Sequence, residues 1–205
     1  ELNILSIGLK IKENNIAYYV IGKGSNLLVS DDGIDGIVIK ISSKFSDIKV
    51  DGNTIYATSG ASMPLVSITA KNNMLSGFEF ACGIPGTIGG SIYGNAGAYN
   101  ACILDYVTSV TVLDENLEVL TIDHEDIEYG YRTTMFKEKK NYIILGAKFF
   151  LKEGDKKSSL DIIADRRKRR VESQPLEYPS AGSVFRNPEG DFAGRLIESC
   201  NLKGY

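Results

Sequence analysis

The sequence predicts a mixed fold of the α+β class, and three observations support this prediction. Short apolar runs separated by glycine or aspartate turns are typical of strands. Two longer stretches, one after Ser62 and one from Ser159, carry apolar residues at helical spacing. Between them lies a glycine-dense segment, residues 77–100, which we expect to form an ordered loop system.

The first part of the chain predicts a short helix followed by strands. The pattern before residue 16 indicates a helical tail, and residues 18–21 predict a buried strand. Further short strands are predicted at residues 27–29, 37–39 and 54–58, because β-branched and apolar residues are bounded there by turn residues.

A helix with a defined start is predicted after these strands. Ser62 is the expected N-cap, since its hydroxyl can accept a hydrogen bond from an otherwise unpaired backbone N–H. The apolar residues that follow have helical spacing: Leu65, Val66, Ile68 and Met74.

The second half predicts a hairpin, a long strand and a long helix. Residues 107–113 and 117–122 flank a polar turn, and residues 142–151 form the next apolar run. A second unit is expected to begin near Glu153, with a helix at 159–173 that ends before Gln174-Pro175. The predicted apolar side of this helix consists of Leu160, Ile163, Ala164 and Val171.

Composition narrows the class of protein. The chain has 205 residues, 43% of them hydrophobic and 24% charged, and no apolar run reaches the roughly 18 residues of a membrane span. The net charge of −3 does not favour non-specific nucleic-acid binding. The three cysteines, Cys82, Cys102 and Cys200, form no CxxC pair, so we expect no metal site and a reducing cytoplasm. No obligate protein partner is evident.

A first glycine-rich motif, Gly22-Lys23-Gly24-Ser25-Asn26, follows a predicted strand. Glycines there let backbone N–H groups approach an anion, and Ser25 and Asn26 add side-chain hydrogen bonds. The motif is neither a Rossmann fingerprint, because Leu27 replaces the third glycine, nor a P-loop. By itself it is equally consistent with a tight turn.

A second motif runs from Phe80 to Gly90 and continues into Asn95-Ala96-Gly97-Ala98-Tyr99. Turns and close strand crossings would explain a single glycine. The density of glycines here favours a backbone that wraps a large ligand, because each glycine costs conformational entropy on ordering. Together the two motifs suggest a diphosphate that carries a ring system.

Five stretches together resemble the UDP-N-acetylenolpyruvoylglucosamine reductase family, in its short form. They are the Gly22–Asn26 motif, residues 77–86, residues 95–99, Tyr131-Arg132, and residues 175–185, and they occur in the family's order. The resemblance covers residue 16 to the end. It implies an FAD-binding fold of the vanillyl-alcohol-oxidase (PCMH) type, with subdomains at residues 1–45 and 46–152 for flavin and at 153–205 for substrate.

The resemblance also implies a non-covalent FAD, with NADPH as co-substrate and a UDP-sugar as substrate. The only histidine, His124, lies outside the glycine motifs, so a covalent flavin link is not expected. The implied cofactor contacts are Gly22, Lys23, Gly24, Ser25, Asn26, Leu27, Gly83, Ile84, Pro85, Gly86, Gly89, Gly90, Ser91, Asn95, Ala96, Gly97 and Ala98.

Two catalytic residues are carried over from the family. Ser183 matches its proton donor, and Arg132 matches the arginine that stabilises the developing enolate. Without the resemblance, Arg132 would be interpreted as a surface ion pair and Ser183 as a strand-edge hydroxyl. Tyr178 and Asn187 are the expected substrate contacts in the last segment.

The ends of the sequence lead us to expect that both are cut. There is no initiator Met at Glu1, and the chain stops at Tyr205 just after a predicted helix. The family's third catalytic residue is a glutamate near its C-terminus, and no position here matches it. We therefore expect poor turnover from this chain alone.

The run Arg166-Arg167-Lys168-Arg169-Arg170 lies on a predicted helix and must point several ways at once. We expect most of it to be solvated and partly paired with Asp161, Asp165 and Glu172, whereas Arg170 is the candidate phosphate ligand. His124 is interpreted as a turn residue and Cys82 as a small packing residue.

Two alternatives to a reductase remain at this point. One is a flavin- or nucleotide-binding module without its own reaction, which would need no acid near the ring. The other is an oxidase of the same flavin superfamily, which usually carries a histidine or cysteine for covalent attachment.

Overall fold

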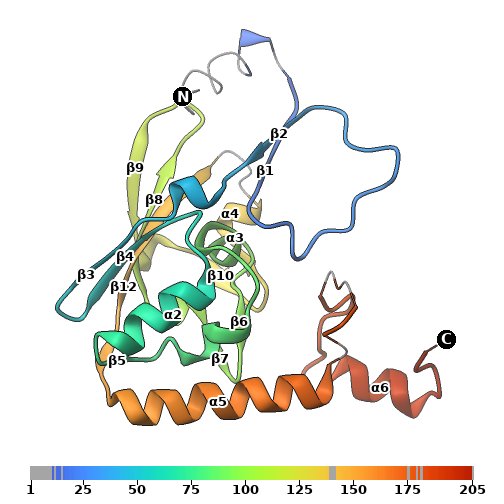
Figure 1. The fold of residues 1–205 in the computed structure, drawn as a ribbon. Coiled ribbons are helices and arrows are strands. Elements are labelled where there is room, and N and C mark those ends of the chain that lie inside the picture. Colours follow the sequence, from blue (N-terminus) through green and yellow to red (C-terminus); the bar gives the residue numbers. More distant parts are fainter. Residues whose placement is uncertain are drawn as a thin grey trace.

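The computed structural model describes residues 11, 13, 14, 16–138, 142–174, 176–178, 180 and 182–204 (Figure 1). The predicted helical tail before residue 16 lies mostly outside the described residues, as do Pro175, Pro179 and Ala181 of the last motif.

An antiparallel five-stranded sheet forms the centre of the molecule, in the order β3-β4-β12-β8-β9. Its strands are β3 (Ile48–Asp51), β4 (Thr54–Thr58), β12 (Ile143–Phe150), β8 (Val107–Leu113) and β9 (Val119–Asp123). Ala147 of β12 pairs with Ala57 on one side and Val110 on the other, and all three are fully buried. The predicted hairpin is confirmed as β8 and β9, and the strands predicted at residues 54–58 and 142–151 are confirmed as β4 and β12.

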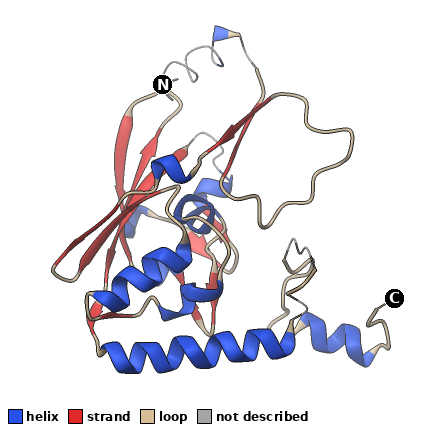
Figure 2. Ribbon diagram, in the orientation of Figure 1, coloured by secondary structure: helices blue, strands red, loops and turns tan. Residues whose placement is uncertain are grey.

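Helices cover one face of this sheet. Helix α2 (Met63–Asn72) begins at Ser62, whose hydroxyl accepts a hydrogen bond from Leu65 N at 3.4 Å, which confirms the predicted N-cap. Helix α3 (Ile88–Tyr93) buries Ile88 and Ile92 in the same core. Figure 2 shows α2 and α3 on one side of the strands.

The glycine-dense segment is more regular than an ordered loop system. It contains the 3₁₀ helix η2 (Glu79–Gly83), helix α3 and the strand β6 (Gly97–Ala98), and it is flanked by the strands β5 (Leu75–Ser76) and β7 (Ala101–Cys102), the second of which pairs with β6. Gly89 lies inside α3, where its N–H bonds to Ser59 O and an added Cβ would come within 2.8 Å of Ser59 Cβ. Several of these glycines therefore allow close packing between elements.

A small parallel pair, β1 (Tyr18–Ile21) and β2 (Ile37–Lys40), lies apart from the main sheet. The strand at 18–21 is confirmed, but the prediction that it is buried is wrong. Tyr19 and Val20 are exposed, because two strands form too narrow a surface to bury their side chains. The strand predicted at 27–29 is also wrong: this stretch pairs with no strand among the described residues, and Leu28 is 94% exposed in the long loop seen in Figure 1.

The remaining elements lie between the strands already described or follow β12. They are η1 (Ser43–Phe45), η3 (Ile103–Asp105), η4 (His124–Asp126), β10 (Tyr129–Gly130), β11 (Thr133–Thr134), α4 (Met135–Glu138), β13 (Lys152–Glu153), α5 (Lys156–Ser173) and α6 (Ala193–Ser199). None of the helices described is long and apolar enough to cross a membrane.

Helix α5 is confirmed, but its predicted apolar side is wrong for three of its four residues, because only Ile163 faces the protein. The side that packs against the protein carries Ser159, Ile163, Arg166 and Arg170, spaced by four, three and four residues. Leu160 and Val171 are 45% and 60% exposed. The partners of α5 include polar groups of η2 and the β6–β7 hairpin, so its inward side is largely polar.

Candidate functional site

The first glycine motif directly follows β1 and faces the second. An added Cβ on Gly22 would collide with the Oγ1 atom of Thr87, so the two backbones meet at this point. Gly24 has a φ of +70°, which glycine adopts without strain, and its carbonyl accepts from Leu27 N. Lys23, Asn26 and Leu27 are exposed, whereas Ser25 is half-buried.

The second motif is fixed by backbone hydrogen bonds to the segment that precedes α2. Ile88 N bonds to Ala61 O at 2.8 Å, and Met63 N bonds to Gly86 O at 3.1 Å. Residues 83, 84 and 86 are half-buried, Pro85 and Gly90 are exposed, and Ser91 is buried. The structure thus brings two of the predicted cofactor segments together.

The third predicted cofactor segment is organised by Asn95. Its amide Nδ2 donates to Gly130 O at 2.9 Å, and its Oδ1 accepts from Leu104 N at 3.4 Å. Asn95 is buried and has a φ of +42°, while Ala96, Gly97 and Ala98 are half-buried. An added Cβ on Gly97 would collide with the carbonyl oxygen of Ala101, so the β6–β7 hairpin requires glycine there.

Arg132 is bound to this third segment. It lies in the turn between β10 and β11 with a φ of +60°, and its guanidinium donates to Asn95 O at 3.2 Å and Gly97 O at 2.7 Å. The guanidinium also lies 5.0 Å from the ring centroid of Tyr131. A non-glycine residue held at positive φ stores strain, and such residues concentrate at functional sites.

A pocket of about 200 Å³ lies beside Arg132. Its lining adds three residues that the sequence did not single out as site residues, Cys102, Tyr129 and Gly130. Burial raises the pKa of the Cys102 thiol, and Asp105, which accepts a hydrogen bond from it at 3.0 Å, raises it further. Both effects favour the protonated thiol. Tyr129 could have been suspected from its position two residues before the Tyr131-Arg132 motif.

The segment that carries Ser183 reaches the first glycine motif. Gly182 has a φ of +89°, and an added Cβ there would lie 3.0 Å from Asn26 Oδ1. Ser183 and Tyr178 are exposed. In the part of the chain that the structure describes, no hydrogen bond joins Ser183 to Arg132.

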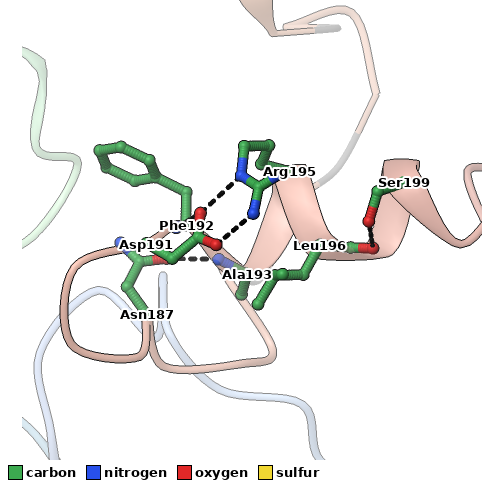
Figure 3. A network of polar contacts seen from close by, with 7 residues as sticks. All are labelled: Asn187, Asp191, Phe192, Ala193, Arg195, Leu196 and Ser199. Carbon is green, nitrogen blue, oxygen red and sulfur yellow. Dashed lines mark hydrogen bonds and ion pairs between the residues drawn. The ribbon is translucent and has the colours of Figure 1, made fainter.

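Asn187 has a local structural partner. Its Oδ1 accepts from Ala193 N at 3.1 Å at the start of α6, where Asp191 also pairs with Arg195 (Figure 3). The side chain of this expected substrate contact is therefore engaged within its own segment.

The five-cation run divides between two sides of α5. Arg169 pairs with Asp165 at 2.9 Å and Lys168 with Glu172 at 3.9 Å, which confirms the expected surface pairing for two of the three acids. Arg170 faces inward: its Nη1 lies 3.1 Å from where a Cβ on Gly83 would be, and its Nε donates to Gln174 Oε1. Arg170 thus reaches the second glycine motif.

The sequence did not single out Arg166 as a site residue. Its guanidinium lies 4.6 Å from the ring centroid of Tyr99, and Tyr99 Oη donates to Arg166 O at 3.3 Å. Its Nη1 atom is buried and has no hydrogen-bond partner among the described residues. The i, i+4 spacing to Arg170 is the sequence signal that could have found it.

The other two candidates behave as packing residues. Burial raises the pKa of the Cys82 thiol, and Arg166 and Arg170 only partly offset this effect. His124 begins the 3₁₀ turn η4 and packs on Tyr129, with 5.5 Å between ring centroids. No group of three or more metal-ligating side chains occurs within the described ranges.

Comparison with known proteins bears on this site. A family model described as FAD binding domain matches residues 6–123, and one described as UDP-N-acetylenolpyruvoylglucosamine reductase, C-terminal domain, matches residues 174–205. Proteins named UDP-N-acetylenolpyruvoylglucosamine reductase from Clostridium botulinum and Clostridium beijerinckii are 47% and 50% identical over 194 residues. These matches cover 95% of this chain and 63% of each relative, so the chain spans less than two thirds of their length.

A solved structure gives the same result at the level of the fold. The crystal structure of UDP-N-acetylenolpyruvylglucosamine reductase from Thermus caldophilus matches with a TM-score of 0.83 and 32% identity, covering 97% of this chain and 72% of that one. The predicted α+β fold of the FAD-binding type is thereby confirmed. The chain belongs to the UDP-N-acetylenolpyruvoylglucosamine reductase family, and its residues 6–123 to the FAD binding domain family.

Proposed function

We propose that this chain is the flavin-binding part of an FAD-dependent reductase. The reaction is reduction of the enolpyruvyl group of UDP-N-acetylenolpyruvoylglucosamine to UDP-N-acetylmuramate, with NADPH as reductant, in peptidoglycan precursor synthesis. The observation that carries the proposal is the attachment of Arg132 to the carbonyls of Asn95 and Gly97, in a chain of this family.

The residues present fit a non-covalent FAD. The two glycine motifs meet at Gly22 and Thr87, where there is no room for a side chain on residue 22. A backbone free of side chains can approach a diphosphate and a ring closely. When bound, the flavin supplies the hydride transfer from nicotinamide to substrate, and the protein supplies binding and orientation.

Arg132 is proposed to stabilise the negative charge that develops on the substrate. Its two hydrogen bonds to Asn95 and Gly97 use one N–H on each terminal nitrogen. A guanidinium has five N–H donors, so others remain for a carboxylate or enolate. Because an arginine stays charged at any working pH, this stabilisation is always available.

Ser183 is proposed as the proton donor to the carbon next to the reduced one. A serine hydroxyl is a weak acid, so it needs positive charge close by in the closed site. The contact of Gly182 with Asn26 supports a place for Ser183 beside the first glycine motif. Arg170, Tyr178 and Asn187 are proposed to contact the UDP-sugar.

We propose the division into subdomains at residues 1–45, 46–152 and 153–205, and a cytoplasmic location. The free cysteines Cys82, Cys102 and Cys200 support a reducing compartment. The alternative of a binding module without a reaction is less well supported, because it gives no role to a strained Arg132.

The first test is a visible spectrum of the purified protein before and after addition of FAD and desalting. Retained flavin bands near about 370 and 450 nm are expected, and the flavin should stay in solution after acid precipitation because no covalent link is proposed. Flavin in the acid pellet would contradict that part of the proposal.

The second test follows the two half-reactions. NADPH should bleach the bound flavin, and the UDP-sugar should restore its colour. Arg132→Lys should slow only the second step, by roughly 100- to 1,000-fold, because a point charge replaces the guanidinium. Arg167→Lys on the exposed side of α5 is the control. Because poor turnover is expected from this chain, the colour of the parent protein should return slowly, and no recovery at all on long incubation would favour the module.

A further inference from the structure

A buried carboxylate that the proposed chemistry does not use lies next to the second glycine motif. Glu79 begins the 3₁₀ helix η2 and is 8% exposed. Its Oε2 accepts from Gly77 N at 2.8 Å, and its Oε1 accepts from Ser159 Oγ of α5 at 2.7 Å. An ionised side chain is rarely buried without a structural or functional reason, because desolvation opposes it.

The backbone at Gly77 is held from two sides. Gly77 has a φ of +122°, and an added Cβ would lie 2.5 Å from Cε1 of Tyr106. Tyr106 in turn stacks on Phe80 of η2, with 5.8 Å between ring centroids and an interplanar angle of 14°. The Gly77–Glu79 hydrogen bond therefore lies in a rigid, aromatic-packed part of the loop.

The Glu79–Ser159 hydrogen bond joins residues 80 positions apart in the chain. Ser159 lies in the first turn of α5. The other residues on the inward side of this helix are Ile163, Arg166 and Arg170. With one aliphatic residue on that side, apolar packing does little to fix the rotation of the helix. A change of register by one residue would turn each of these side chains by about 100°.

The two arginines on the inward side of α5, Arg166 and Arg170, lie beside the second glycine motif. Arg170 packs on Gly83, and both Arg166 and Arg170 act electrostatically on Cys82. We propose that Glu79 is a positioning residue: through Ser159 its buried carboxylate sets α5 across η2 and holds the two arginines against Cys82 and Gly83. The use of FAD binding to test this role rests on the proposed function.

The flavin test compares Glu79→Gln and Ser159→Ala with the controls Glu118→Gln and Ser199→Ala, both at exposed positions. Each tested variant should bind FAD about tenfold more weakly and shift the visible flavin band, because a hydrogen bond to a charged group is lost. The double variant should bind FAD no more weakly than Glu79→Gln, since both changes remove the same hydrogen bond between Glu79 and Ser159. A lower melting temperature with unchanged affinity and spectrum would mean a structural role only.

A second readout needs no flavin. In a Cys102→Ser/Cys200→Ser background, the alkylation rate of Cys82 against pH reports its thiol pKa. Ser159→Ala keeps Glu79, Arg166 and Arg170, so any change reflects their positions. The apparent pKa of Cys82 should rise in Ser159→Ala, because the arginines move away. An unchanged profile overturns the positioning role, whereas a shifted profile in a protein that binds no FAD overturns only the proposed function.

Discussion

Single residues fix where the two glycine motifs meet. Gly22 faces Thr87 so closely that even a methyl group is excluded, although residue 22 has an ordinary backbone conformation. Glycine is therefore needed at position 22 because Thr87 occupies the space of a side chain, and substitution of Thr87 tests this directly.

Gly22→Ala should lower both the melting temperature and the FAD affinity, because the new methyl group overlaps the Thr87 hydroxyl. Thermal unfolding with and without FAD measures both effects. Gly22→Ala combined with Thr87→Ala should recover part of the loss. Gly194→Ala is the matched control, because nothing lies within 4 Å of its added Cβ. No recovery in the double variant would contradict the assigned collision.

Glu79 makes stability depend on pH in a predictable direction. Burial favours the neutral carboxyl, but hydrogen bonds from Ser159, the Glu79 and Gly77 backbone N–H groups and Ser76 outweigh it and hold the pKa of Glu79 below its ordinary value of 4.5. A group with a lowered folded pKa stabilises the protein above its unfolded pKa, and this contribution is lost as pH falls through the folded pKa.

The unfolding free energy of wild type minus that of Glu79→Gln should therefore be constant above about pH 5.5 and shrink below about pH 4.5. Urea denaturation at a series of pH values measures it. Asp155, Asp191 and Glu198, whose pKa values are also lowered, titrate in both proteins, so their effects cancel. A difference that stays constant down to pH 4 would exclude the linkage.

At the scale of elements, the sequence predicted strands and helix starts better than it predicted burial. The β8–β9 hairpin and the α2 cap follow from local rules, because the turn residues and Ser62 lie beside the elements they define. The inward side of α5 could not be predicted this way. Its neighbours are Glu79 and Tyr99, which lie far away in the chain and whose polar contacts replace an apolar stripe.

Helix α5 supplies a prediction that reverses the sequence interpretation. Val171→Lys should change the free energy of unfolding by less than about 0.5 kcal/mol, because Val171 is exposed. Ile163→Asp should cost several times more, because a charge would enter the half-buried side. Denaturant unfolding of the two variants distinguishes the sides, and equal losses would restore the original assignment.

Site residues in local motifs could be predicted from the sequence, whereas those placed by contacts between distant segments could not. The glycine motifs and Arg132 are visible in the sequence, and the structure joins them through backbone carbonyls. Arg166, Cys102 and Tyr129 were missed, since each enters the site through a partner that is remote in the sequence or through the shape of a pocket. Ser183 and Arg132 both lie in motifs of the family, but no hydrogen bond joins them in the part of the chain that the structure describes.

At the scale of the whole molecule, the β1–β2 pair and its long loop extend away from the main sheet (Figure 1). Lys23 is exposed in this loop, and the next lysine or arginine is Lys40. Limited trypsin digestion should therefore cut first after Lys23, and excess FAD should slow the cut because ligand binding opposes local opening. Mass spectrometry of the fragments measures both. Protection by FAD at α5 alone would place the ligand elsewhere.

The order of the central sheet has a consequence for synthesis of the protein. Strand β12 is the last of the five in the chain, yet it lies in the middle, between β4 and β8. The hairpins β3–β4 and β8–β9 can form locally, but neither can join the other until residue 150 has left the ribosome. Until then each hairpin presents an unpaired apolar edge, so folding should be slow and the nascent chain sensitive to aggregation.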